Sequence, residues 1–208
     1  MSTPKAVASC TDTYSESILL PHGVTRRMMV TTCAAFGLIG SSDVALAQSA
    51  SPERMQRPKP GDKLVFAVGQ DAGQEIAPGA LSEGGPQALA WAVDPNTGVV
   101  RDGSRLNQVL VVRLAESSLS ELTRKRSAGS VVAYSAICPH ALCPVTEWRR
   151  DLEILHCPCH NSEYDPRQAA MVVNGPALRA LASLPLSLEK GVLVVAEPFI
   201  GKVGAQQA

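Results

Sequence analysis

Short apolar runs separated by turn residues make up most of the chain after about residue 60. Runs of about four to eight residues rich in Val, Ile, Leu and aromatic side chains are typical of strands when Gly, Asn or Asp bounds them. They predict strands at 63–69, 88–93, 108–114, 130–137, 152–156 and 191–196. The turns between them read DPNTG, DGS, SAGS and EKG. We therefore expect a mostly β protein with strands at the spacing of a sandwich or barrel.

Two stretches interrupt this pattern. AESSLSELTRKR at 115–126 predicts one short helix, because its acidic residues come early and its basic residues late, as the helix dipole favours. The basic run at 124–126 is interpreted as the solvated end of that helix. Residues 71–87 are rich in Gly and Pro and predict an irregular insertion.

The N-terminal region has the order of an export signal. Arg26 and Arg27 precede a short apolar run at 28–40, and a small-residue Ala-Leu-Ala site ends at Ala47. The paired arginine is similar to that of a twin-arginine leader, so we expect residues 1–47 to direct export to the periplasm. Cleavage after Ala47 is favoured, because the apolar run is shorter than the roughly 18 residues of a membrane span. Retention as an uncleaved membrane anchor stays open.

Composition constrains the chain beyond the leader. Residues 48–62 are rich in Pro, Ser and charge and predict a linker, which leaves 63–203 as the folded domain. With 45% hydrophobic and 18% charged residues, the chain can bury a core. Lys plus Arg equals Asp plus Glu at 19 each, so nothing indicates nucleic acid or an anionic membrane as a partner.

The chemistry is concentrated in the stretch CPHALCPVTEWRRDLEILHCPCH at 138–160. It holds four of the six cysteines and three of the four histidines. Two boxes, C-P-H-A-L-C and C-P-C-H, each offer a thiolate and an imidazole. A hairpin between them can bring the two sets together, as a binuclear iron–sulfur centre with two cysteines on one iron and two histidines on the other requires. The expected ligands are Cys138, His140, Cys157 and His160.

Other uses of these residues fit less well. A structural zinc site usually has C-x₂₋₄-C with H-x₃₋₅-H spacing, which these boxes do not follow. Two plain disulfides would leave the histidines without a role, and a Cys–His nucleophile pair does not need four cysteines. A redox-sensing or zinc-binding module stays open as a minor alternative. No catalytic site of its own is readable, so any catalysis is expected to belong to a partner.

The two boxes resemble those of the Rieske iron–sulfur proteins, whose pattern is C-x-H-x-x-C followed by C-P-C-H. The resemblance implies an antiparallel β-sandwich or barrel with a small cluster-binding subdomain, here at about 137–178, and one [2Fe–2S] cluster per chain. It implies a disulfide between Cys143 and Cys159. It also implies that the hydroxyls of Ser162 and Tyr164 bond a cluster sulfide and a ligand cysteine, which raises the reduction potential.

The resemblance extends to NGPAL at 174–178, which is similar to the loop that covers the cluster in this family. Gly175 and Pro176 match that loop, whereas Leu178 stands where a second proline is common. His156 has no counterpart among the ligands and is interpreted as structural. Histidine ligation removes negative charge, so a potential of roughly −150 to +300 mV is implied, with proton coupling through the ring N–H groups.

The resemblance also limits the setting. Ring-hydroxylating oxygenases need a second iron site with two histidines, and no histidine follows His160. The YSAICPH run and the closing VAEPFIGKVG look similar to the small subunit of arsenite oxidase. We therefore expect an exported electron-transfer subunit that works between a periplasmic dehydrogenase or molybdenum subunit and a c-type cytochrome.

The alternative is a Rieske subunit of a quinol-oxidising cytochrome bc complex. The tip of the first box usually reads Leu-Gly there, but this chain has Ala141 and Leu142. The second box has Asn161 where Gly is usual, and Asn tolerates a left-handed backbone. These departures change the surface that would meet a quinol, and favour a soluble or loosely bound carrier.

Overall fold

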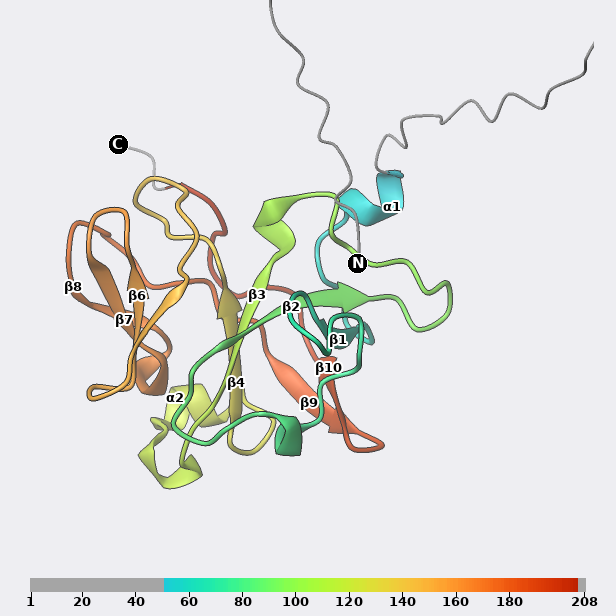
Figure 1. Cartoon of the computed structure of the whole chain (residues 1–208), viewed down its shortest axis with the longest axis horizontal. Coiled ribbons are helices and arrows are strands. Elements are labelled where there is room, and N and C mark those ends of the chain that lie inside the picture. The colour runs from blue at the N-terminus through green and yellow to red at the C-terminus, as the bar shows by residue number, and fades with distance from the viewer. Residues whose placement is uncertain (1–50, 206–208) are drawn as a thin grey trace, which may run out of the picture. The chain divides into compact units, whose positions relative to one another are not determined.

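Figure 1 shows the computed structural model of the chain, which describes residues 51–205. The predicted leader at 1–47 lies outside these residues. The described part is mostly β, as expected, and its strands form two antiparallel sheets of six and four strands. No helix among the described residues is long and apolar enough to cross a membrane.

The six-stranded sheet has the order β4-β3-β2-β1-β10-β9. Its strands, in chain order, are β1 Lys63–Phe66, β2 Ala88–Val93, β3 Val109–Arg113, β4 Val131–Ser135, β9 Leu186–Glu189 and β10 Val192–Val195. Side chains of β3 alternate between two apolar clusters, with Leu110 and Val112 in one and Val109 and Val111 in the other. This strand is covered on both faces, which explains its unbroken apolar sequence.

The four-stranded sheet has the order β5-β6-β7-β8 and carries the second box. Its strands are β5 Glu147–Arg149, β6 Ile154–Cys157, β7 Ser162–Asp165 and β8 Met171–Asn174. Leu155 and Tyr164 face each other across β6 and β7 and are fully buried. They join Leu110 and Tyr134 of the larger sheet in one core, so the small sheet is fixed to the large one by apolar packing.

The six predicted strands are confirmed, with ends that differ by a few residues. The strands β5, β7, β8 and β9 were not predicted, because segments such as EWR and SEYD are short and carry charge. The predicted helix at 115–126 is wrong in extent. It is a 3₁₀ turn at Glu116–Ser118 and a one-turn helix, α2, at Glu121–Arg124. The Ser120 hydroxyl accepts the N–H of Thr123 and so caps a new start.

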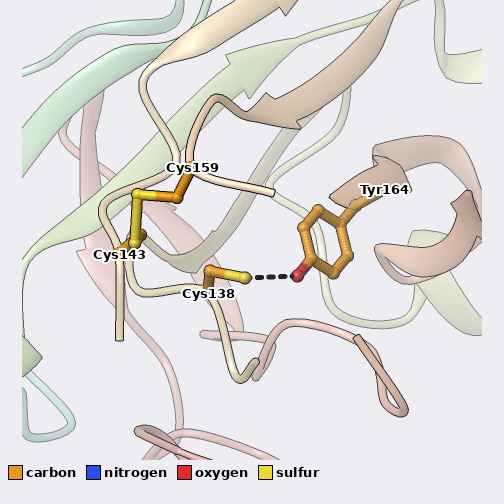
Figure 2. The surroundings of a disulfide bond; sticks show 4 residues. All are labelled: Cys138, Cys143, Cys159 and Tyr164. Carbon is orange, nitrogen blue, oxygen red and sulfur yellow. Dashed lines mark hydrogen bonds between the residues drawn. A yellow bond between two sulfur atoms is a disulfide. The ribbon is translucent and has the colours of Figure 1, made fainter. Parts of the chain in front are cut away.

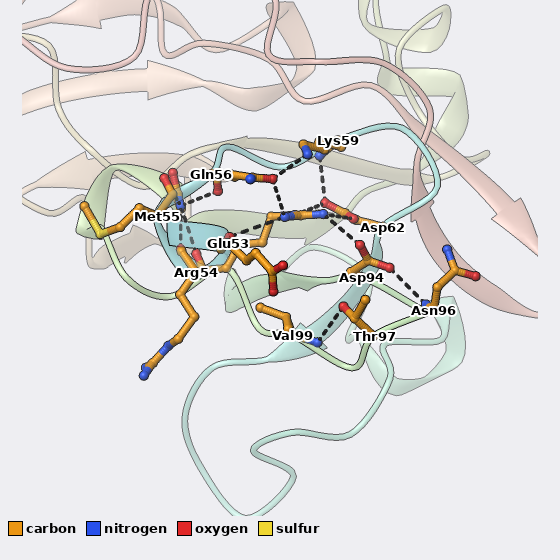
Figure 3. A network of polar contacts seen from close by, with 12 residues as sticks. Glu53, Arg54, Met55, Gln56, Lys59, Asp62, Asp94, Asn96, Thr97 and Val99 are labelled. Carbon is orange, nitrogen blue, oxygen red and sulfur yellow. Dashed lines mark hydrogen bonds and ion pairs between the residues drawn. The ribbon is translucent and has the colours of Figure 1, made fainter. Parts of the chain in front are cut away.

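The described part of the predicted linker, residues 51–62, packs on the larger sheet. It includes a second one-turn helix, α1, at Pro52–Met55. Asp62 accepts two hydrogen bonds, of 2.5 and 2.8 Å, from the Arg101 guanidinium, which is 2% exposed. Gln56 and Asp94 converge on the same group (Figure 3). This buried ion pair attaches the described part of the predicted linker to the folded domain.

Candidate metal centre

The first box forms a loop that follows β4. The N–H of Cys138 donates to the carbonyl of Cys143 (2.8 Å), and the N–H of Leu142 donates to the carbonyl of Cys138 (3.1 Å). Leu142 has a left-handed backbone with a φ of +62°. The two bonds close the loop and hold its tip, where Ala141 is exposed.

The second box forms the tight connection between β6 and β7, in which Cys157 pairs with Ser162. The N–H of Asn161 donates to the carbonyl of Cys157 (3.1 Å), and Asn161 has a φ of +58°. Each loop therefore contains the same turn, which ends four residues after its first cysteine on a left-handed residue. His140 and His160 project from these two turns.

A disulfide between Cys143 and Cys159 joins the two loops, as the resemblance implied (Figure 2). The Cα atoms of the pair lie 6.4 Å apart. Three cysteine sulfurs, those of Cys143, Cys157 and Cys159, lie within 4.8 Å of one another. Because two of them are bonded to each other, only Cys157 of this group can serve as a thiolate ligand.

Cys138 and Cys157 are free thiols, and each is 1% exposed. Burial raises the pKa of the Cys157 thiol, and the neighbouring Cys138 raises it further. The Tyr164 hydroxyl lies 3.0 Å from the sulfur of Cys138 (Figure 2). Burial, and then the contact with Cys138, raises the pKa of Tyr164, so its hydroxyl keeps its proton and can donate to that sulfur.

The two histidine rings meet edge to face, with centroids 4.7 Å apart and planes at 87°. The Nδ1 atom of His140 is buried and has no hydrogen-bond partner, whereas the His160 side chain is exposed. A buried imidazole nitrogen without a donor has a lone pair available for a metal. Two buried thiols and two adjacent imidazoles fit a cluster that takes two cysteines and two histidines.

The loop at 174–178 lies against the second box. A Cβ atom placed on Gly175 would come within 2.5 Å of the Asn161 carbonyl oxygen and of the Ser162 Cα atom. The N–H of Ala177 donates to the Ser162 hydroxyl oxygen (3.3 Å), and Ser162 is fully buried. Pro176 is exposed beside the box.

The sequence interpretation missed a polar cluster on the outer face of the small sheet. His156 is 3% exposed, and its ring lies between Glu147 and Asn161. Residue alternation in β6 places Cys157 and His156 on opposite faces, which was the available signal. It also missed Arg179, whose guanidinium donates to the carbonyls of Lys202 and Gly204 and holds the C-terminal segment.

Comparison with known proteins agrees with this geometry. Residues 95–185 match the family model of the Rieske [2Fe-2S] domain. The chain is 36% identical over 104 residues to the cytochrome bc1 complex Rieske iron-sulfur subunit of Corynebacterium diphtheriae. The aligned region covers 47% of this chain and 26% of that subunit. It is also 34% identical over 142 residues to the "Putative respiratory nitrate reductase subunit Rieske" of Haloferax mediterranei. This aligned region covers 67% of this chain and 60% of that subunit. The chain thus spans less than two thirds of either relative.

Among solved structures, the ferredoxin of carbazole 1,9a-dioxygenase from Nocardioides aromaticivorans matches with a TM-score of 0.39 and 19% identity, covering 59% of this chain and 94% of that one. The soluble domain of the Rieske protein II from Sulfolobus acidocaldarius matches with a TM-score of 0.35 and 15% identity, covering 71% and 82%. The family match spans both boxes and the loop beside them. Residues 95–185 of this chain therefore match a Rieske [2Fe-2S] domain, and the disulfide between Cys143 and Cys159 is consistent with the disulfide-containing type.

Proposed function

We propose that this chain is a periplasmic one-electron carrier whose cluster is held by the four expected ligands. These are Cys138, His140, Cys157 and His160. The supporting observation is the arrangement of two buried free thiols beside an edge-to-face pair of imidazoles, in two loops joined by a disulfide. When bound, a cluster of this kind accepts and returns one electron at roughly −150 to +300 mV.

The residues around the ligands have distinct tasks. Burial of Cys138 and Cys157 keeps water away from the sulfurs. Donation from the Tyr164 hydroxyl to the Cys138 sulfur stabilises negative charge on that sulfur, which favours the reduced state. His160 is exposed and is the ligand that a redox partner can reach.

The proposed partners are a periplasmic dehydrogenase, such as a molybdenum subunit, as electron donor, and a c-type cytochrome as acceptor. The Haloferax relative is named as a subunit of a respiratory nitrate reductase, which supports a place in a respiratory assembly. The tip also supports this choice, because Leu142 and Asn161 replace the usual glycines on the surface around the histidines.

The second candidate is a Rieske subunit of a quinol-oxidising cytochrome bc complex. The identity with the Corynebacterium bc1 subunit favours it. To discriminate, the purified holoprotein is mixed with quinol and a bc-type cytochrome b partner, or with a soluble cytochrome c. Fast exchange with cytochrome c and slow or no reduction by quinol are expected. Rapid quinol-driven reduction in a stable bc assembly would reverse the ranking.

The cluster itself is tested by analysis of the purified chain. Visible absorption typical of iron–sulfur proteins is expected, with iron and acid-labile sulfide in equal amounts. A colourless protein that contains zinc would refute the carrier and favour the zinc-binding module.

Export is proposed to use the paired arginine and to move a folded, cluster-loaded protein. A disulfide between the loops suits an oxidising compartment. Replacing Arg26 and Arg27 together by Lys should hold the protein in the cytoplasm, as measured by fractionation of cells. Normal arrival of the double variant in the periplasm would contradict the proposed route.

A further inference from the structure

We propose that His156 is a positioning residue that fixes the second box through the side chain of Asn161. The inference rests on the proposed ligand roles of Cys157 and His160, between which this contact acts. It assigns a task to a buried histidine that is not among the expected ligands.

His156 lies on the central strand β6 with its ring on the face opposite the core. The ring Nδ1–H donates to the Glu147 carboxylate at 2.8 Å, because a carboxylate can only accept. The ring Nε2 lies 3.2 Å from the Asn161 side-chain oxygen and 3.3 Å from an Arg149 guanidinium nitrogen. Glu147 pairs directly with His156 across β5 and β6, so the sheet itself sets the ring plane.

Asn161 is the residue through which a fixed ring can act on the loop. Its N–H closes the turn on the Cys157 carbonyl, and its own carbonyl lies under Gly175 of the covering loop. The side chain is the third attachment, and it ends on His156. Because the ring proton is on Nδ1, Nε2 is an acceptor, so the Asn161 amide bonds it through its NH₂ group; rotation of the amide exchanges its oxygen and nitrogen at this place.

The position of this contact decides its effect. His160 directly precedes Asn161, and Cys157 directly follows His156, so both proposed ligands of this box adjoin the contact. A left-handed glycine would form the same turn without a side chain to hold it. Asn161 instead connects the turn to a buried ring, which limits the movement of His160. Groups that orient metal ligands in this way typically change metal affinity by about 10–100-fold when they are removed.

The test compares three variants of the full holoprotein: His156→Leu, Asn161→Gly and the double variant. The readouts are the rate of cluster loss to a chelator, followed by visible absorption, and the electron paramagnetic resonance spectrum of the reduced protein. Each single variant is expected to lose its cluster about tenfold faster than the parent and to give a broadened spectrum. Since one contact is removed in all three, the double variant should be no worse than the worse single variant.

Two further variants separate positioning from general stability. His156→Gln restores an amide near the place of the ring nitrogen and should recover part of the slow cluster loss. Leu188→Ala removes a half-exposed side chain of β9, the edge strand of the larger sheet, and should leave both readouts unchanged. If His156→Leu does not fold, Asn161→Gly still decides the matter, because the Asn161 side chain is exposed and Gly accepts its φ.

Additive effects of the two single changes, or unchanged cluster loss and spectrum in Asn161→Gly, would overturn the proposal. Failure of the proposed function looks different. In that case the parent protein itself would lack iron and sulfide, before any variant is made.

Discussion

The two box loops have the same backbone turn but different side-chain support. Each turn closes through an N–H four residues after the first cysteine, on Leu142 in the first box and on Asn161 in the second. Both residues have a left-handed φ, of +62° and +58°. Asn accepts this conformation readily, whereas it costs a residue such as Leu about 1–2 kcal/mol.

The support for Leu142 comes from packing. A Cβ atom on Gly204 would lie 3.8 Å from Leu142 Cδ2 and 4.0 Å from Leu106 Cδ2, so the C-terminal segment runs beside the first box. Arg179 holds that segment through the carbonyl of Gly204 at 2.5 Å. Asn161 instead bonds to His156 of the small sheet. One turn is thus held by apolar contact with a distant segment, and the other by hydrogen bonds to its own sheet.

The largest effect is expected from replacing the proposed histidine ligand of either loop, and it should be the same for both. Replacing either His140 or His160 by Ala should abolish the native electron paramagnetic resonance signal, because each loop supplies one imidazole to the same centre. Ala141→Ser, at the exposed tip between the ligands, is the matched control and should keep the signal. An unchanged signal in either histidine variant would contradict the ligand set.

The disulfide is the covalent connection between the loops. Replacing Cys143 and Cys159 together by Ser should lower the free energy of unfolding by about 3 kcal/mol, because the closed loop no longer restricts the unfolded chain. The measurement is unfolding by denaturant. Titration of thiols in the exported parent should find neither cysteine reactive; two reactive thiols there would show that the loops are not joined.

Gly175 tests how closely the second box is covered. Gly175→Ala should destabilise by about 2 kcal/mol more than Gly191→Ala, because only the first Cβ would overlap the backbone of Asn161 and Ser162. Both glycines have similar positive φ, of +89° and +84°, so the control carries the same backbone strain. Equal unfolding midpoints for the two variants would mean that the loop at 174–178 can move away from Asn161 and Ser162 at no cost in stability.

Exchanging the left-handed residues tests the comparison of the loops directly. Asn161→Leu should cost about 1–2 kcal/mol, since it adds the strain of a left-handed Leu and removes the bond to His156. Leu142→Asn should change the free energy of unfolding by less than about 0.5 kcal/mol, because relief of strain offsets the lost packing. Denaturant unfolding measures both. A larger loss of unfolding free energy in Leu142→Asn than in Asn161→Leu would show that the first loop depends more on its left-handed side chain than the second.

The smallest effect is expected outside both loops, in the segment at 51–62. Hydrogen bonds from Arg54 hold the pKa of Asp102 below its ordinary value. A lowered folded pKa adds stability above the unfolded value of about 3.9, and that stability disappears as the pH falls through the folded value. Asp102→Asn should therefore lower the melting temperature slightly near neutral pH and by less in acid. The spectrum of the centre should not change, and a change there would connect this segment to the loops.

Much of the site can be predicted from local sequence. The residue types and spacing of the two boxes predict the sulfur and nitrogen donors, because the ligands within one loop are only a few residues apart. The apolar runs likewise identify six strands from local sequence, because the side chains of a strand alternate between its two faces every second residue. The charged strand β5 and the short β7 carry too little of that pattern to be recognised.

The contacts that hold the site depend on segments far apart in the chain. Glu147, His156 and Asn161 form one cluster only because β5 and β6 pair in a given register. The approach of Gly175 to Asn161 and the ion pair of Arg101 with Asp62 likewise join distant residues.

Residue types and their spacing were therefore enough to predict the proposed ligands of a [2Fe–2S] centre and a mostly β fold. How the two loops are held follows from the folded contacts instead, with the C-terminal segment beside Leu142 and His156 beside Asn161. The physical reason is that donor chemistry belongs to residue type and local spacing. The orientation of those donors depends instead on strand register and long-range packing, which local periodicity does not encode.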